Sequence, residues 1–322
     1  MLPVIGPMAV RVEVIVNRNA SKRRSKRSYR HDVVSTFERS GATVHVTGSL
    51  DELREVARGI AERRPDSVVL AGGDGTLMRS LSALHLEYGS SVLPSIALVP
   101  AGTVDTIARN TASHVVGRKA LVRLASRVAD GSARSAFQST LRVRDDRGGD
   151  RIGFMFGAGL VSRFFDLYNS SPRQGRLPAA VLACRVSLGS LVGSSFAKRI
   201  LEPELGTLRV NGDEKSAVAW SLVLASVLPD VGLHLRVAYR AREEPGRFHV
   251  VASALRGCAL ALQLPRVVAG FPMRGANSVD ELGKTAEFVF GNSEGVYVLD
   301  GDVFQARRVD IGCGPEITLL TL

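Results

Sequence analysis

Residues 67–76 read SVVLAGGDGT, and this stretch decides how the N-terminal half of the chain folds. The apolar residues 67–70 predict a short buried strand, and the glycines predict a turn into a helix over 77–88. Glycine lets backbone N–H groups approach phosphates, and a helix N-terminus adds partial positive charge. Asp74 places an acid there, which is unfavourable unless it serves Mg²⁺ or a proton. The alternative is a plain glycine turn with Asp74 as a helix cap.

A similar arrangement follows one strand later. Residues 95–99 (SIALV) predict another buried strand, and the small residues of PAGT at 100–103 precede a helix. Turns at the ends of neighbouring parallel strands would form one continuous phosphate-binding rim, to which Gly102 and Thr103 contribute. The loop that begins at Asn17, after a strand over residues 10–16, is placed to form a third wall. An ordinary strand-to-helix loop is the alternative for the second turn, and a solvated charge run for the basic residues beyond Asn17.

The rest of the chain divides into two patterns. Up to about residue 135, strands alternate with helices (strand 42–46, helices 51–63 and 118–130), which predicts a parallel sheet covered on both faces. Beyond it, strand-like runs dominate and helical stretches occur only at 178–192 and 254–263, which favours an antiparallel, sandwich-like domain. The expected strands of this part lie at 137–143, 152–156, 218–227, 233–239, 248–252, 287–290, 296–299, 303–306 and 317–322.

Length and charge restrict the class of protein. At roughly 150 residues per domain, 322 residues correspond to about two domains. The formal net charge is +11, with seven basic residues and no acid between Arg18 and Arg30, which predicts attraction to polyanions such as nucleotide phosphates or anionic lipid headgroups. Three scattered cysteines argue against a disulfide framework or zinc site and favour a reducing compartment. We expect neither a transmembrane helix nor a secretory signal.

A last motif lies near the C-terminus, where Asp300-Gly301-Asp302 reads locally as a hairpin turn. GGDGT after a strand, PAGT before a helix and a late DGD turn together resemble the diacylglycerol kinase catalytic domain family, which includes bacterial lipid kinases, sphingosine kinases and ceramide kinases. The resemblance implies an α/β nucleotide-binding domain over 1–135, a β-rich lipid-substrate domain over 136–308, and an active site in the cleft between them. It also implies that the strand at about 309–322 returns to the first domain.

The resemblance further implies roles for individual residues. Asp74 would organise Mg²⁺ and phosphate, while Asp302, with Asp300 beside it, would accept the proton of a lipid hydroxyl. The implied substrate is a diacylglycerol, sphingoid base or ceramide, and an acyl pocket is expected near Phe154, Phe156, Phe164, Phe165 and Leu167. ATP would be bound by Asn17, Thr47, Gly72, Gly73, Asp74, Gly75, Thr76, Gly102 and Thr103.

The chain departs from the family pattern in three places. The loop at residues 17–21 reads NRNAS and lacks the usual proline and glycine. The family's Gly-Thr-x-Asn-Asp becomes Gly102-Thr103-Val104-Asp105-Thr106, which moves a carboxylate by one residue. Asp302 replaces the usual glutamate and is one methylene shorter. The region 228–232 is short, so we do not predict the structural Mg²⁺ site of some bacterial members.

These departures keep two other functions open. One is a lipid- or nucleotide-binding homologue that has lost catalysis, and the other is an NAD kinase, which shares GGDGT but fits the second motif poorly. The expected partners are a lipid substrate and, peripherally, an anionic membrane surface, with a cytoplasmic location; a homodimer is compatible with the sequence. Nucleic acid is not expected, because no stacking aromatic pattern accompanies the basic run.

Overall fold

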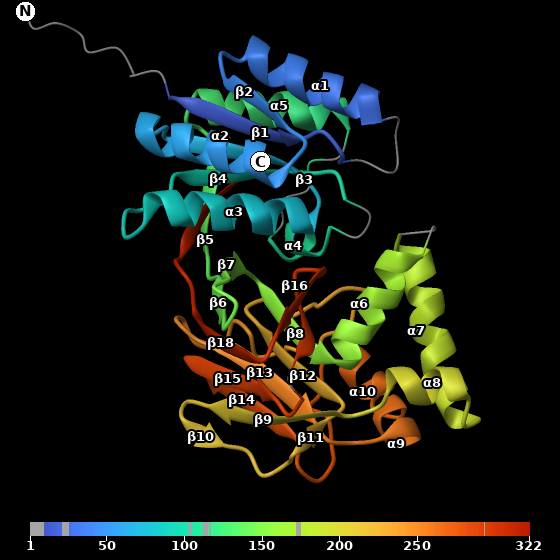
Figure 1. The fold of residues 1–322 in the computed structure, drawn as a ribbon. Coiled ribbons are helices and arrows are strands. Elements are labelled where there is room, and N and C mark those ends of the chain that lie inside the picture. Colours follow the sequence, from blue (N-terminus) through green and yellow to red (C-terminus); the bar gives the residue numbers. More distant parts are fainter. Residues whose placement is uncertain are drawn as a thin grey trace, which may run out of the picture. The chain divides into compact units, whose positions relative to one another are not determined.

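A computed structural model describes residues 10–20, 26–102, 105–111, 115, 117–171, 175–292 and 294–322 (Figure 1). The chain divides into two compact units, which are described one at a time. Unit 1 comprises Met1–Gln138 and Glu316–Leu322, and unit 2 comprises Ser139–Pro315. The α/β N-terminal part followed by antiparallel β-rich sheets confirms the predicted fold class.

Unit 1 is built on a six-stranded sheet in the order β2-β1-β3-β4-β19-β5. The first five strands run parallel, and β5 is antiparallel to β19. Only β19 comes from the end of the chain, so the returning segment is shorter than the expected 309–322. The strands are β1 (Val12–Asn17), β2 (Thr43–Thr47), β3 (Ser67–Gly72), β4 (Ser95–Pro100), β5 (Arg134–Gln138) and β19 (Ile317–Thr321).

Helices cover both faces of this sheet (Figure 1). On one face, α1 (Lys26–Arg39) and α5 (Arg118–Ala129) pack onto alternate strand residues in one apolar cluster. The other face carries α2 (Leu50–Arg63) and α3 (Asp74–Tyr88), which pack against each other. The central strands are apolar on both sides because both sides are buried, as expected for a parallel sheet.

Unit 2 contains two antiparallel sheets. One has the order β10-β9-β15-β18-β6-β7, with β11 paired to β9, and the other has the order β14-β13-β12-β8-β16-β17. The first sheet uses β6 (Leu141–Asp145), β7 (Asp150–Gly153), β9 (Glu204–Val210), β10 (Asp213–Glu214), β11 (Ala219–Trp220), β15 (Thr285–Phe290) and β18 (Arg308–Cys313). The second uses β8 (Met155–Gly159), β12 (Leu222–Ser226), β13 (Phe248–Ser253), β14 (Val279–Gly283), β16 (Gly295–Leu299) and β17 (Asp302–Ala306).

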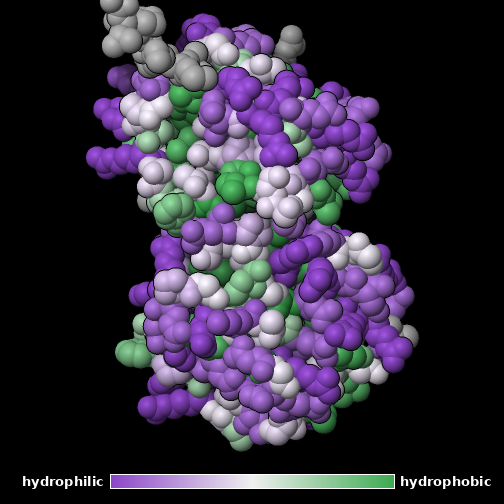
Figure 2. Space-filling model, turned by 90° about the vertical axis from the view of Figure 1, so that its left-hand side faces the viewer, coloured by the Kyte–Doolittle hydropathy of each residue, from purple (hydrophilic) through white to green (hydrophobic). Residues whose placement is uncertain are grey.

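A group of helices accompanies the second of these sheets. Helix α6 (Leu160–Ser170) packs against β8, β12 and β16, while α7 (Arg176–Leu191) packs against α8 (Ser195–Ile200) and α9 (Gly257–Ala261). The short α10 (Leu264–Val268) follows α9. None of the helices in the described part of the chain is long and apolar enough to cross a membrane. Hydrophilic side chains cover most of the face shown in Figure 2.

Three expectations for the second half of the chain were wrong. Residues 233–239 form turns rather than a strand, and Leu233 and His234 have positive φ angles of 54° and 61° that a strand cannot accommodate. The expected strand 137–143 is divided between β5 and β6, which belong to different sheets. Helix α6 and strand β9 were not predicted, because β9 is only half-buried and α6 begins directly after a buried strand.

Candidate functional site

Four of the parallel strands of unit 1, β1 to β4, bring the predicted loops to one edge of the sheet. Asn17 at the end of β1 pairs in register with Thr47 at the end of β2. Gly72 at the end of β3 pairs with Pro100 at the end of β4. Because parallel strands end at the same edge, the loops after all four strands form a common rim, as expected for ligand sites in such sheets.

The glycines of the two turns are required by close approaches. A Cβ at Gly72 would lie 2.4 Å from Cβ of Thr76, and a Cβ at Gly73 would lie 3.0 Å from Cα of Gly102. The amide of Ala101 also donates a 2.8 Å hydrogen bond to the carbonyl oxygen of Gly72. The two turns are therefore in van der Waals contact, and together they make the continuous rim that the sequence predicted.

The N-terminus of α3 opens onto this rim. The helix begins at Asp74, with Gly73 as its N-cap in extended conformation and no side chain capping it within the described residues. The first N–H groups of a helix have no acceptor within the helix, so those of residues 74–76 are available to a ligand. Their aligned dipoles favour an anion, and phosphates bind at such termini in many nucleotide sites.

Asp74 is fixed by the second turn rather than left in solvent. Its carboxylate accepts hydrogen bonds from the amides of Thr106 (2.8 Å) and Ile107 (3.2 Å), at the start of α4 (Thr106–Asn110). The pKa of Asp74 is raised to about 6, because burial and the nearby Asp105 carboxylate raise it by more than the two amides lower it. Asp74 is thus held in place where its ionised form is disfavoured. The plain helix-cap alternative requires neither this fixed position nor this raised pKa.

Asp105 replaces the family's asparagine without disturbing the turn. It adopts a left-handed conformation with φ of 52°, and its Oδ1 accepts a 2.7 Å hydrogen bond from the amide of Gly102. Asparagine and aspartate both tolerate this conformation and can accept this bond. The replacement therefore preserves the geometry and adds a negative charge beside Asp74. Thr103 lies outside the described residues.

The loop after β1 is tied to the same rim. Nδ2 of Asn17 donates a 2.7 Å hydrogen bond to Oγ1 of Thr76, and Oδ1 of Asn17 accepts one of 2.8 Å from the amide of Asn19. The amide of Arg18 donates to the carbonyl oxygen of the buried Thr47 at 2.8 Å. Asn17 therefore links two of the predicted walls, while Thr47 contributes through its backbone.

One residue at this edge was not predicted. Tyr29 of α1 donates a 3.1 Å hydrogen bond from its hydroxyl to the carbonyl oxygen of Val99, at the end of β4. Burial raises the pKa of Tyr29, and the Asp105 carboxylate raises it further, which places the ring close to the second turn. No sequence signal identified it, because a single aromatic residue in a basic run has no characteristic pattern.

The residues present fit a magnesium–nucleotide complex. Mg²⁺ in such sites is held by one or two carboxylates together with substrate phosphates. Asp74 and Asp105 lie close enough for the charge of one to raise the pKa of the other, and both border a small cavity of about 20 Å³ next to Gly73. No group of three acidic, histidine or cysteine ligands occurs among the residues that the structure describes, so phosphate oxygens would have to complete the set.

The predicted catalytic turn forms in unit 2, but its two aspartates differ. Asp300 and Gly301 have φ angles of 50° and 92°, and Leu299 pairs with Asp302 across the β16–β17 hairpin. The buried carboxylate of Asp300 accepts hydrogen bonds from the amides of Phe154 (3.0 Å) and Met155 (2.9 Å). Asp300 therefore holds the hairpin against β8. These hydrogen bonds give Asp300 a structural role; the catalytic role expected for it stays a prediction.

Asp302 is the partly exposed aspartate of the turn. Helix α6 fixes the turn beside it, since Nδ2 of Asn169 donates to the carbonyl oxygen of Gly301 at 3.1 Å. Phe165 of α6 lies against Gly301, because a Cβ added at Gly301 would be 3.3 Å from the ring of Phe165. The ring of Phe165 also contacts the ring of Phe164. Both phenylalanines are partly exposed, whereas the expected pocket residues Phe154 and Phe156 are fully buried in the core and offer no surface to a ligand.

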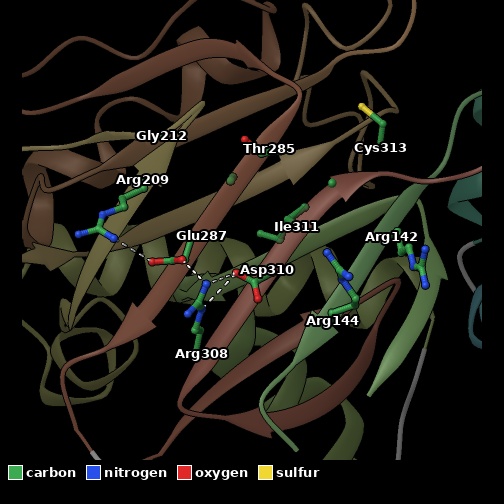
Figure 3. A pocket seen from close by; sticks show the side chains of 12 residues that line it. Arg142, Arg144, Arg209, Gly212, Thr285, Glu287, Arg308, Asp310, Ile311 and Cys313 are labelled. Atoms are coloured by element: carbon green, nitrogen blue, oxygen red, sulfur yellow. Dashed lines mark hydrogen bonds and ion pairs between the residues drawn. The ribbon is translucent and has the colours of Figure 1, made fainter. Parts of the chain in front are cut away.

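A separate cavity of about 580 Å³ lies on the outer face of the first sheet of unit 2 (Figure 3). It contains none of the predicted residues. Two of its arginines are engaged by acids: Arg308 lies 2.6 Å from Glu287 and 3.1 Å from Asp310, and Arg209 lies 3.6 Å from Glu287. We attribute these charges to pairing between and along neighbouring strands on a sheet face.

Comparison with known proteins bears on the family of the chain. Residues 11–136 match the model of the diacylglycerol kinase catalytic domain, which confirms the resemblance inferred from the motifs. A protein named "Probable lipid kinase YegS-like" from Xanthomonas axonopodis pv. citri is 36% identical over 102 residues, and one of the same name from Xanthomonas oryzae pv. oryzae is 37% identical over 105. These alignments cover 30% and 32% of this chain, and 33% and 30% of the relatives, so the chain spans about a third of the length of the curated relatives it matches.

Solved structures resemble the whole chain in fold. A diacylglycerol kinase from Bacillus anthracis aligns with a TM-score of 0.64 and 12% identity over 98% of both chains. Another structure from the same organism aligns with a TM-score of 0.68 and 13% identity over 99% of both. At this identity the likeness establishes the fold of both parts of the chain, and nothing beyond it.

Proposed function

We propose that this chain, which carries a diacylglycerol kinase catalytic domain over residues 11–136, is a kinase that transfers the γ-phosphoryl group of ATP to the hydroxyl of a lipid. The observation that carries the proposal is the rim of unit 1. There, the glycine turn after β3 presents the N-terminus of α3, and the next turn fixes Asp74 through two amides. The N-terminus of α3 would bind phosphates, and Asp74 would serve Mg²⁺.

Residues of unit 1 would bind and orient the nucleotide. The N–H groups of residues 74–76 would bind phosphate oxygens, and Gly72 and Gly73 would let the phosphates approach the backbone. Asn17 holds Thr76 and so keeps the first turn of α3 in position. Bound Mg²⁺ would be held by Asp74 and would neutralise the charge of the phosphates.

In unit 2, Asp302 would accept the proton of the lipid hydroxyl. Asp300 does not compete for this role, because its carboxylate is engaged by the amides of residues 154 and 155. Phe164 and Phe165 next to the turn supply partly exposed apolar surface for an acyl chain. The proposed substrate is a diacylglycerol, a sphingoid base or a ceramide, at a peripheral membrane surface in the cytoplasm.

The test is transfer of label from γ-labelled ATP, with Mg²⁺, to a panel of diacylglycerol, monoacylglycerol, sphingosine and ceramide, followed by extraction into organic solvent. We expect one lipid class to be labelled by the wild-type protein and by Asp51→Asn, an exposed control of the same chemistry in α2. We expect Asp74→Asn to abolish labelling while the protein remains folded. Formation of labelled NADP when NAD is the acceptor would instead identify an NAD kinase.

A second candidate, a homologue that binds lipid or nucleotide without turnover, is favoured by one observation. The family's second acid is Thr106 here, and Asp105 is engaged by the Gly102 amide. This candidate predicts ATP binding by calorimetry with no labelled lipid. It also predicts that the double change Asp105→Asn, Thr106→Asp, which restores the family pattern, creates activity. An active wild-type protein would exclude it.

A further inference from the structure

Helix α7 of unit 2 carries apolar side chains on two opposite sides. On one side, Val186 is buried in a cluster with Ile200 of α8 and Leu260 of α9. The other side is exposed and also apolar, with side chains that are between 54% and 82% exposed. This exposed set consists of Leu177, Val181, Leu188, Leu191 and the C-cap residue Val192.

The exposed set forms a single stripe. From Leu177 the others follow at i+4, i+11, i+14 and i+15, and at about 100° per residue they fall within an arc of roughly 100°. Cys184, at i+7, is exposed in the same stripe. A helix that is apolar on both sides is normally buried on both. The stripe therefore has the composition of a contact surface, although it faces solvent.

The neighbouring segments also expose apolar side chains. Leu262 follows α9, Val268 ends α10, and Phe271 comes shortly after; all three are about half exposed or more. Helix α7 packs against α8 and α9, and Figure 1 shows α7 to α10 gathered on one side of the unit. Clustered large apolar side chains of this kind mark sites of contact with a partner or a membrane.

The charges around these side chains have one sign. Residues 167–201 contain five basic residues and no acidic one, and residues 254–279 contain three arginines and no acidic residue. Arg185, Lys198, Arg199 and Arg256 are exposed. These two segments therefore combine apolar side chains with cationic ones and contain no acidic residue, although the exposed Asp166 and Glu202 flank the first of them.

We infer that the surface formed by the α7 stripe docks onto an anionic lipid bilayer. Apolar side chains of a helix lying in the plane of the interface enter the headgroup–acyl boundary, and the surrounding cations meet lipid phosphates. A second copy of this chain fits less well, because pairing two such surfaces would oppose like charges. The inference deepens the proposed function, since it places the protein where a lipid substrate lies, but vesicle binding can be measured without catalysis.

The test uses the full chain without ATP and measures co-sedimentation with vesicles of phosphatidylcholine alone or with 30% phosphatidylglycerol. We expect binding to the anionic vesicles, weakened at least tenfold in Val181→Glu/Leu188→Glu. The control Val92→Glu/Val218→Glu makes the same change at two other exposed valines and should bind like the wild-type protein. Thermal unfolding of all three proteins should coincide, because none of the four side chains is buried.

Other outcomes overturn the inference. Wild-type protein that does not bind the anionic vesicles excludes this surface as a membrane contact. Equal binding by Val181→Glu/Leu188→Glu does so too, and loss of binding in Lys22→Gln/Arg23→Gln/Arg24→Gln alone would assign the contact to the N-terminal basic run. A wild-type dimer that becomes monomeric in Val181→Glu/Leu188→Glu would show self-association instead. Phosphorylation of a dispersed short-chain lipid, equal in wild type and variant, reports the proposed function separately from docking.

Discussion

The carboxylate of Asp74 should destabilise the folded protein at neutral pH. Burial and the Asp105 charge raise its pKa from 3.8 to about 6. A shift of about two units corresponds to at most about 3 kcal/mol that the folded state loses when Asp74 is ionised. Such a cost is expected where a partly buried acid serves function rather than stability.

The sign of the pH dependence follows from the raised pKa. Between pH 3.8 and about 6 the folded state keeps a proton on Asp74 that the unfolded state has lost. The penalty is therefore absent at low pH, grows over this window and is constant above it. From pH 5 to pH 8 the free energy of unfolding should fall by about 1.4 kcal/mol from this group alone.

Asp74→Asn removes this penalty. The side chain of asparagine has one acceptor oxygen, so it keeps only one of the two hydrogen bonds that the carboxylate accepts from the amides of Thr106 and Ile107. This loss lowers the free energy of unfolding by about 1 kcal/mol at every pH. The informative quantity is therefore the change with pH. The stability of Asp74→Asn relative to the wild-type protein should increase by about 1.4 kcal/mol between pH 5 and pH 8.

Urea unfolding at pH 5 and pH 8, in buffer with EDTA and without nucleotide, measures this difference. Metal binding would otherwise deprotonate the carboxyl group. Asp51→Asn, an exposed aspartate of the same unit, controls for the substitution and should show no such change. If the stability difference between Asp74→Asn and the wild-type protein is the same at both pH values, the pKa of Asp74 is not raised in the folded protein, and the reasoning is refuted.

Three further substitutions test other parts of the account. Gly72→Ala places a methyl group against the side chain of Thr76, so we expect at least tenfold weaker ATP binding by calorimetry and a loss of about 1–3 kcal/mol in stability. Asp300→Ala leaves two buried amides without an acceptor and should cost about 2–3 kcal/mol in urea unfolding. Glu13→Gln weakens the pair between the buried Glu13 and the half-exposed Arg63 and should cost about 1–2 kcal/mol at pH 7. Because the pKa of Glu13 is lowered, the stability difference from the wild-type protein should narrow as the pH falls below 4.5.

The α/β half of the fold could be predicted because its strands are buried on both faces. Such strands appear as short apolar runs, and the glycine turns after β3 and β4 mark where they end. Unit 2 was predicted in class but not in detail. In half-buried strands such as β9, apolar and polar residues alternate only weakly. In residues 233–239, apolar and polar residues alternate as in a strand, but the segment folds into turns.

The site was predicted where a motif carries it and not where the contact is distant in sequence. The glycine rim follows from local sequence, and the roles of Asn17 and Thr47 came from the family resemblance. Tyr29 meets Val99, 70 residues away, and nothing in either segment signals the other. The DGD turn likewise does not reveal that amides 146 and 145 residues away engage the carboxylate of Asp300.

The central claim is that the chain transfers phosphate from ATP to a lipid hydroxyl, and its most direct test compares the wild-type protein with Asp302→Asn. The measurement is transfer of labelled γ-phosphate into an organic-extractable lipid, with ATP affinity determined in parallel. We predict labelled lipid for the wild-type protein and at least a hundredfold slower labelling for Asp302→Asn. ATP affinity should be unchanged, and Asp213→Asn, an exposed control in the same unit, should be fully active. Absence of labelled lipid with wild-type protein that binds ATP, or full activity in Asp302→Asn, would contradict the account.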